Sequence, residues 1–121
     1  MNRQEMQKRT KQFALRIIRL AACLPTGRAG DVLGRQLLKA GTSVGANYRE
    51  ACRASSRRHF ITTLEISARE ADETQYWLEL IAESALVKPA RLTGLVRECN
   101  EIVAILTAAC RTAKRNKNPT S

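Results

Sequence analysis

Residues 57–84 read RRHFITTLEISAREADETQYWLELIAES and carry the clearest helical pattern in the chain. Apolar side chains return there at steps of three and four residues, the spacing that puts them on one face of an α-helix. This stripe consists of Leu64, Ala68, Ala71, Leu78 and Ala82. Its length predicts one long helix with one face turned towards a protein core.

A second apolar group in the same segment lies on a face roughly opposite to the first and contains Ile66, Trp77 and Leu80. A helix that is apolar on two faces is covered on two faces. One face is predicted to pack into the core of the domain, and the other to contact a second copy of the chain. We therefore predict an oligomer interface at these three residues.

Three further helical segments surround this one and cover about residues 3–24, 28–53 and 89–114. The breaks between the four segments are Pro25-Thr26-Gly27, Ala54-Ser55-Ser56 and Val87-Lys88-Pro89. Short turns force consecutive helices to run antiparallel. The predicted fold is all-α, an up-down-up-down antiparallel four-helix bundle. It forms a single domain over residues 1–121, with a frayed basic tail over about 115–121.

The second helical segment is rich in small residues, which are Gly34, Ala40, Gly41, Ser43, Gly45 and Ala46. A glycine inside a helix costs up to about 1 kcal/mol relative to alanine. Close approach of a neighbouring helix would compensate for that cost, and a flexible hinge is the alternative.

The composition fits one helical domain with its own core, since the chain has 121 residues, 44% apolar residues and only three prolines. A formal net charge of +10 points to an anionic partner, with nucleic acid first and a membrane surface second. A merely well-solvated surface is the alternative. No apolar stretch approaches the roughly 20 residues that span a bilayer, and no signal peptide is visible at the N-terminus. We expect a cytoplasmic protein with no membrane partner.

The predicted topology gathers positive charge at one end of the bundle, because the start of the first helix, the second turn and the end of the fourth helix meet there. Twelve of the 21 basic residues fall at this end, and they are the predicted nucleic-acid-binding residues: Arg3, Lys8, Arg9, Lys11, Arg49, Arg53, Arg57, Arg58, Arg111, Lys114, Arg115 and Lys117. Only Glu5 and Glu50 are expected to oppose them locally.

Cations in the first turn of a helix oppose the helix dipole, so Arg3, Arg57 and Arg58 point to a role other than stability. Arginine makes bidentate contacts with phosphate. Aromatic side chains that could stack on bases are not interleaved with these cations. Contact with the phosphate backbone of RNA or DNA, with little reading of base sequence, is therefore predicted.

Residue types that carry catalysis or bind metals are scarce. The chain has one histidine, His59, and its four cysteines, Cys23, Cys52, Cys99 and Cys110, form no close pair. A zinc site or a di-metal site would need short ligand spacings or a second histidine. No serine or cysteine has an evident acid–base partner, and no phosphate-binding glycine loop with its lysine is present. We predict that the protein is not an enzyme, has no metal site or cofactor, and keeps its cysteines as buried thiols.

The middle of the chain resembles a known family. The residues that carry the resemblance are Gly41-Thr-Ser-Val-Gly-Ala-Asn-Tyr-Arg-Glu-Ala51, followed by Ser56, Phe60, Leu64, Ile66, Glu70-Ala71, Glu73 and Tyr76-Trp77-Leu78. They are similar to the four-helix-bundle proteins encoded in intervening sequences of bacterial 23S ribosomal RNA genes, and to the related accessory variability determinant of diversity-generating retroelements. The resemblance covers about residues 10–110. It implies a homopentamer with basic surfaces that bind DNA or RNA and, in retroelement members, a complex with a reverse transcriptase.

Four polar residues at matched positions, Ser43, Asn47, Glu50 and Glu73, are predicted to be structural. Because buried polar groups need partners, they are expected to hydrogen-bond between helices and to fix the helix register. The resemblance supplies no catalytic residue.

Two functions follow from these patterns. The first is a non-enzymatic, oligomeric accessory protein that binds nucleic acid through its basic end. The alternative is a protein-binding scaffold ring with no nucleic-acid ligand, which docks a partner through the acidic side of residues 57–84. That side carries Glu65, Asp72, Glu79 and Glu83.

Overall fold

The computed structural model describes residues 1–116, and four helices account for nearly all of them. These are α1 (Arg3–Cys23), α2 (Arg28–Cys52), α3 (Arg57–Glu83) and α4 (Pro89–Arg115). Each bound lies within one residue of the boundary predicted from the sequence. The all-α prediction is confirmed. The predicted frayed tail falls almost entirely on residues 117–121, outside the described part of the chain.

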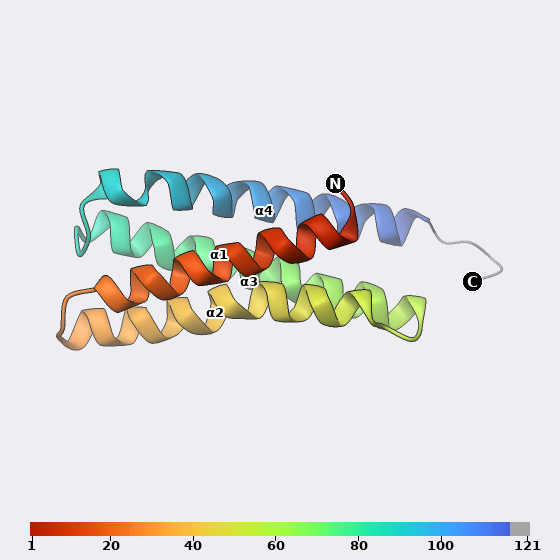
Figure 1. Ribbon diagram of the computed structural model, residues 1–121, viewed down its shortest axis with the longest axis horizontal. Helices are drawn as coiled ribbons and strands as arrows, with labels where there is room; N and C mark the ends of the chain where they lie inside the picture. The colour runs from red at the N-terminus through yellow and green to blue at the C-terminus, as the bar shows by residue number, and fades with distance from the viewer. Residues whose placement is uncertain (117–121) are drawn as a thin grey trace.

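Successive helices run in opposite directions (Figure 1). The start of α1, the turn between α2 and α3 and the end of α4 therefore lie at the same end of the bundle, on the right in Figure 1. The turns α1–α2 and α3–α4 lie at the other end. The up-down-up-down arrangement on which the clustering of charge depends is confirmed.

Local signals explain where the helices begin. The Asn2 side chain accepts a hydrogen bond from the Glu5 backbone N–H at 2.8 Å and caps α1. Ser56 does the same for α3, accepting from the His59 N–H at 3.1 Å. Side-chain oxygens at these positions satisfy backbone donors that have no partner within the helix. Pro89 occupies the first position of α4, where its missing N–H costs nothing.

The core is built from one apolar stripe of each helix. In α3, the predicted inward residues Leu64, Ala71 and Leu78 are almost completely buried. Burying a leucine or isoleucine side chain contributes about 1.5–3 kcal/mol. The other helices add large buried side chains of the same kind, including Phe13, Ile17, Leu37, Val44, Leu92, Ile102 and Leu106.

The glycines of α2 permit close approach of α1. A Cβ atom on Gly41 would lie 2.7 Å from Cγ2 of Ile17, and one on Gly45 would lie 3.2 Å from Oγ1 of Thr10. The first distance is shorter than carbon atoms tolerate, so α1 could not sit where it does against an alanine. Since α2 is continuous from Arg28 to Cys52, close packing and not a hinge accounts for these glycines.

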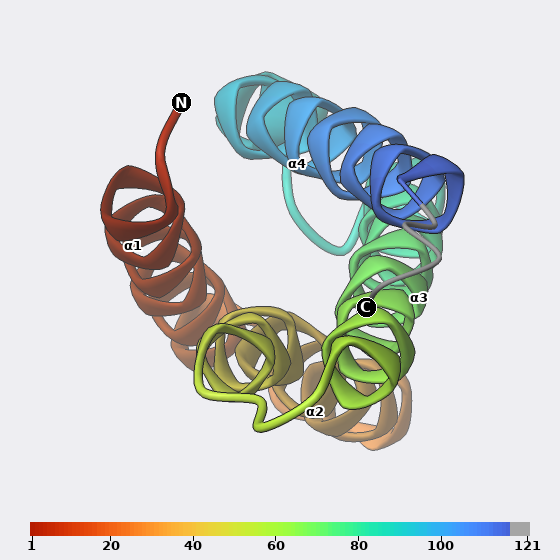
Figure 2. The same cartoon turned by 90° about the vertical axis from the view of Figure 1, so that its right-hand side faces the viewer.

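The four helices form a ring in the order α1, α2, α3, α4 when viewed along the bundle (Figure 2). Of the neighbouring pairs, α1 and α4 touch each other least. The seam between the first and last helices is thus the loosest junction of the bundle.

No helix within residues 1–116 has an apolar stretch long enough to cross a membrane.

Candidate functional site

Eleven of the twelve predicted cations lie in the described part of the chain. Most lie near the end of the bundle where α1 begins and α4 ends, and Arg9 and Lys11 lie further along α1, since Arg9 reaches Glu98 and Glu101 near the middle of α4. We call this group the basic pole. It comprises Arg3, Lys8, Arg9 and Lys11 of α1, Arg49, Arg53, Arg57 and Arg58 around the α2–α3 turn, and Arg111, Lys114 and Arg115 of α4 (Figure 1). Lys117 lies outside the described residues.

Carboxylates from α3 and α4 neutralise two of these cations. Arg9 lies 2.7 Å from Glu98 and 2.9 Å from Glu101, and Lys114 Nζ lies 2.6 Å from Glu65. The hydrogen bond to Glu98 raises the pKa of Arg9, and that to Glu65 raises the pKa of Lys114. The expectation that only Glu5 and Glu50 oppose the pole is therefore wrong, because long side chains from neighbouring helices reach it sideways.

Two other cations of the pole have structural contacts. Nη2 of Arg57 donates a hydrogen bond to the carbonyl of Ala113 at 2.6 Å, in the last turn of α4. Helix C-termini carry partial negative charge, so this contact is favourable. The guanidinium of Arg3 lies 4.8 Å from the centre of the Phe60 ring, a cation–π distance. The position of Arg3 and Arg57 at the starts of helices suggested a role in phosphate binding. Their contacts with Phe60 and Ala113 show that both residues also help to pack the helices together.

Seven cations of the pole remain exposed and make no ion pair or side-chain hydrogen bond to residues 1–116. They are Lys8, Lys11, Arg49, Arg53, Arg58, Arg111 and Arg115. These seven residues are the part of the predicted site whose charge is free to meet an external anion.

Three of them line a groove on the outside of α1 and α2. Lys8 and Lys11 come from α1 and Arg49 from α2, and the groove holds a volume of about 470 Å³. The remaining lining residues are mostly small or polar: Gln7, Ala14, Thr42, Gly45 and Ala46. Because no aromatic side chain lines the groove, it offers cations to a phosphate chain but no surface on which bases would stack.

The predicted oligomer interface lies on a partly exposed apolar strip of α3. Ile66, Trp77 and Leu80 are each only partly buried. Beside them, Tyr76 is 53% exposed and meets the Trp77 ring edge-on, with 5.2 Å between ring centres. Three more large apolar residues are exposed, Leu15 and Ile18 of α1 and Val32 of α2.

Three of the four predicted structural polar residues bond within their own helix, so the expectation of bonds between helices is wrong for them. Ser43 donates to the carbonyl of Lys39 at 2.6 Å. The Asn47 side chain donates to the carbonyl of Ser43 at 2.8 Å, and Glu73 accepts from the Trp77 indole at 3.3 Å. Polar side chains on a helix commonly find a backbone partner one turn back, without any tertiary contact.

Glu50 does face another helix, since its Oε2 lies 3.7 Å from Nε2 of His59 across the α2–α3 turn. A residue that sequence reasoning missed makes a buried hydrogen bond between α2 and α3. Oγ of Ser67 in α3 donates to the carbonyl of Val44 in α2 at 2.7 Å. Its position in the inward stripe of α3 was the available signal.

All four cysteines are free thiols. Cys99 and Cys110 are buried as predicted, and burial raises the pKa of both, that of Cys99 to about 12. Cys23 is exposed, contrary to prediction, because it occupies the last turn of α1 beside the loose seam. Within residues 1–116 no three histidine, cysteine or carboxylate side chains are grouped to hold a metal ion.

Residues 2–108 match the family model described as 23S rRNA-intervening sequence protein. The fold is also similar to a crystal structure from Bacteroides thetaiotaomicron, described as a protein with unknown function from the S23 ribosomal protein family. The two chains are 34% identical with a TM-score of 0.84, over 92% of this chain and 99% of that one. No curated protein matches this chain.

Proposed function

The chain belongs to the 23S rRNA-intervening sequence protein family, and from this premise we propose that it is a non-enzymatic accessory protein that binds the phosphate backbone of RNA or DNA. Its working surface is the unpaired part of the basic pole. It acts in the cytoplasm as a homo-oligomer.

The α1–α2 groove carries this proposal. Lys8, Lys11 and Arg49 line it, all three exposed and without a carboxylate partner in residues 1–116. An unpaired cation next to a polyanion gains free energy by releasing the counterions condensed on the phosphates. The net charge of +10 adds long-range attraction for the same partner.

The salt dependence of binding to random-sequence RNA and DNA tests the proposal. If about six phosphates are neutralised, the logarithm of the affinity falls with the logarithm of salt concentration with a slope near −5. The triple variant Lys8→Ala, Lys11→Ala, Arg49→Ala should reduce that slope by about two to three.

The control is a second triple variant, Lys39→Ala, Arg69→Ala, Arg97→Ala, which removes the same charge from mid-helix positions. It should bind nearly as well as the unaltered protein. Binding that ignores salt, or equal losses in both triple variants, would show that the groove is not the nucleic-acid site.

Assembly into a ring is part of the same proposal. The partly exposed apolar strip of Ile66, Trp77 and Leu80 is the expected contact, and the family resemblance implies five copies. Repeating a weak phosphate site in each copy raises the total affinity without new contacts. Light scattering should give about five times the 13.5 kDa chain mass. Leu80→Glu should lower the mass while leaving the helical circular dichroism unchanged; a monomeric unaltered protein would overturn this part.

A retroelement reverse transcriptase is the proposed protein partner, as the resemblance to the retroelement accessory protein implies. Co-purification with a reverse transcriptase encoded beside its gene is the direct test. Failure to bind such an enzyme, with nucleic-acid binding intact, would remove the partner and leave the rest of the proposal standing.

The acidic side of α3 favours the second candidate, a protein-binding scaffold. Asp72, Glu79 and Glu83 are exposed there, close in sequence to the exposed Tyr76. A scaffold would keep its protein partner when Arg53 and Arg58 are reversed to glutamate, whereas nucleic-acid binding would be lost. The double variant Arg53→Glu, Arg58→Glu therefore distinguishes a protein-binding scaffold from a nucleic-acid-binding protein.

A further inference from the structure

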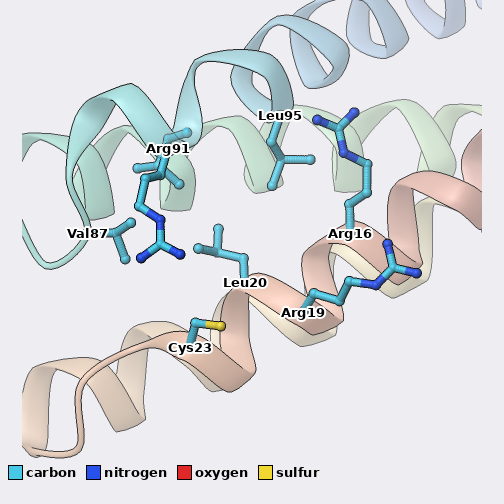
Figure 3. Close-up of a pocket in the computed structure, with 8 residues that line it drawn as sticks. Arg16, Arg19, Leu20, Cys23, Val87, Arg91 and Leu95 are labelled. Atoms are coloured by element: carbon cyan, nitrogen blue, oxygen red, sulfur yellow. The ribbon is translucent and has the colours of Figure 1, made fainter.

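A pocket of about 290 Å³ opens in the seam between α1 and α4, at the end of the bundle away from the basic pole. Figure 3 shows it from the side, with α1 contributing Arg16, Arg19 and Cys23 and α4 contributing Arg91 and Leu95. It shares no residue with the α1–α2 groove. The pocket is therefore distinct from the proposed nucleic-acid-binding groove.

The looseness of the seam explains why the pocket exists. Near the basic pole, Arg9 joins α1 to Glu98 and Glu101 of α4. Within residues 1–116 no further hydrogen bond or ion pair joins these two helices. Beyond the Arg9 contact the helices are free to stand apart, and core side chains are left at the bottom of the gap.

The inner surface of the pocket is aliphatic. Leu20, Leu92 and Leu95 line it together with Val87. Leu92 and Leu95 belong to the buried core, with 1% and 6% of their surfaces exposed. Leu20 and Val87 are only partly buried, so an aliphatic ligand would cover the apolar surface that these two side chains still expose to water.

Three arginines surround this aliphatic surface, Arg16 and Arg19 on α1 and Arg91 on α4 (Figure 3). None makes an ion pair or a side-chain hydrogen bond to residues 1–116. Arg16 crosses the seam, and a Cβ on Gly94 of α4 would lie 3.3 Å from its Nη2. The absence of a side chain at this position leaves room for the guanidinium beside α4. Three cations that have no partner within residues 1–116 thus line one apolar pocket, with Arg91 on one side of Leu20 and Arg16 and Arg19 on the other (Figure 3).

We propose that this pocket binds an amphipathic anion, with a carboxylate or phosphate head held by the arginines and a linear aliphatic chain against the leucines. Guanidinium groups bind both heads through paired N–H···O bonds. Nucleotides fit less well because no aromatic or amide side chain lines the pocket to contact a base. The volume is at the lower end of small-molecule sites, which suits a single chain and not a bulky lipid.

Cys23 provides a direct readout because its exposed thiol lines the pocket, whereas Cys52 lies in α2 at the basic pole. Alkylation of both cysteines is followed by mass spectrometry, with decanoate or decyl phosphate added below micelle-forming concentrations. Either compound should slow alkylation of Cys23 at least fivefold and leave that of Cys52 unchanged.

Two controls each lack one part of the proposed ligand. Decanol lacks the charge and inorganic phosphate lacks the chain, so each should protect Cys23 from alkylation only at tenfold higher concentrations. The relative potency of the two anions distinguishes a fatty-acid from a phospholipid source.

The variant Arg19→Gln, Arg91→Gln should weaken protection by decanoate more than tenfold, while Arg97→Gln, outside the pocket on α4, should not. Protection by decanol equal to that by decanoate, or equal losses in both variants, would overturn the proposal. Stronger protection of Cys23 from alkylation by random-sequence RNA would also overturn it, because the pocket would then bind nucleic acid. If Cys23 becomes more protected as the protein concentration rises without ligand, a second copy of the chain covers the pocket. Loss of nucleic-acid binding in the α1–α2 groove would leave this result unaffected.

Discussion

Arg9 of α1 and Glu98 of α4 form a two-point ion pair across the bundle, with Nε to Oε2 at 2.8 Å and Nη2 to Oε1 at 2.7 Å. The same Nη2 lies 2.9 Å from Glu101. Both partners of the main pair are about four-fifths buried, with 21% of each side chain exposed. This contact fastens the first helix to the last at their loosest junction, so an arginine that looked like a phosphate ligand is a structural residue.

Replacing Arg9 by methionine should reduce the free energy of unfolding by about 1–2 kcal/mol, because a bidentate and partly buried pair exceeds an isolated surface pair. Urea unfolding measures the loss. Lys8→Met is the matched control, since Lys8 is exposed and unpaired within residues 1–116, and its free energy of unfolding should stay within about 0.5 kcal/mol of that of the unaltered protein.

A double-mutant cycle of Arg9→Met with Glu98→Gln should show coupling between the two side chains. Strictly additive losses of stability would contradict the pairing. Nucleic-acid affinity should hardly change in the folded Arg9→Met protein.

Two glycines of α2 should respond to alanine in opposite ways. Gly41→Ala would push a Cβ to within 2.7 Å of Ile17 in the core, and overpacking of this kind costs about 1–3 kcal/mol. Gly34→Ala meets only Leu24 Cδ1 at 3.4 Å, an ordinary contact. It should gain part of the roughly 1 kcal/mol that alanine contributes over glycine in a helix. Thermal unfolding of the two variants tests the close approach of α1; similar stabilities would show that the helices can separate at no cost.

The helix boundaries could be predicted because their signals are local. Pro25, Gly27, Ser56 and Pro89 interrupt a regular apolar pattern, and each acts on the backbone next to it. The basic pole could be predicted as well, since short turns leave only one way to connect antiparallel helices.

The pairing of individual charges could not be predicted in this way. Whether Glu98 reaches Arg9 depends on how far α4 is rotated and shifted relative to α1, and apolar periodicity defines neither to within one side-chain length. Arg57 is a similar case, since its partner is a backbone carbonyl at Ala113. The pocket at Arg91 arises from unequal spacing of the helices, a property of the whole bundle that no single segment encodes.

The arginines around the α2–α3 turn should separate into structural and functional residues. Arg53→Glu with Arg58→Glu should abolish nucleic-acid binding and leave the melting temperature within a few degrees, because both side chains are exposed and unpaired. Arg57→Glu should lower the melting temperature, since it removes the hydrogen bond to Ala113 and places a negative charge beside the C-terminus of α4. Melting curves and RNA-binding titrations on the same samples show which arginines stabilise the fold and which bind RNA. Equal thermal stability of the double variant and of Arg57→Glu would contradict the structural role of Arg57.

Alkaline pH should destabilise the fold through Cys99. Burial raises the pKa of its thiol from 9.0 to about 12, so between these values the unfolded chain releases a proton that the folded chain keeps. Well below pH 9.0 the thiol keeps its proton in both the folded and the unfolded chain, so it gives stability no pH dependence. Between pH 9.0 and about 12 the free energy of unfolding falls as the pH rises. The loss is about 1 kcal/mol between pH 9 and 10 for one such group. The stability difference between the unaltered protein and Cys99→Ala should therefore shrink by that amount across this interval. A constant difference would mean that the folded Cys99 thiol ionises near its ordinary pKa and that the interior at this point of α4 is open to water.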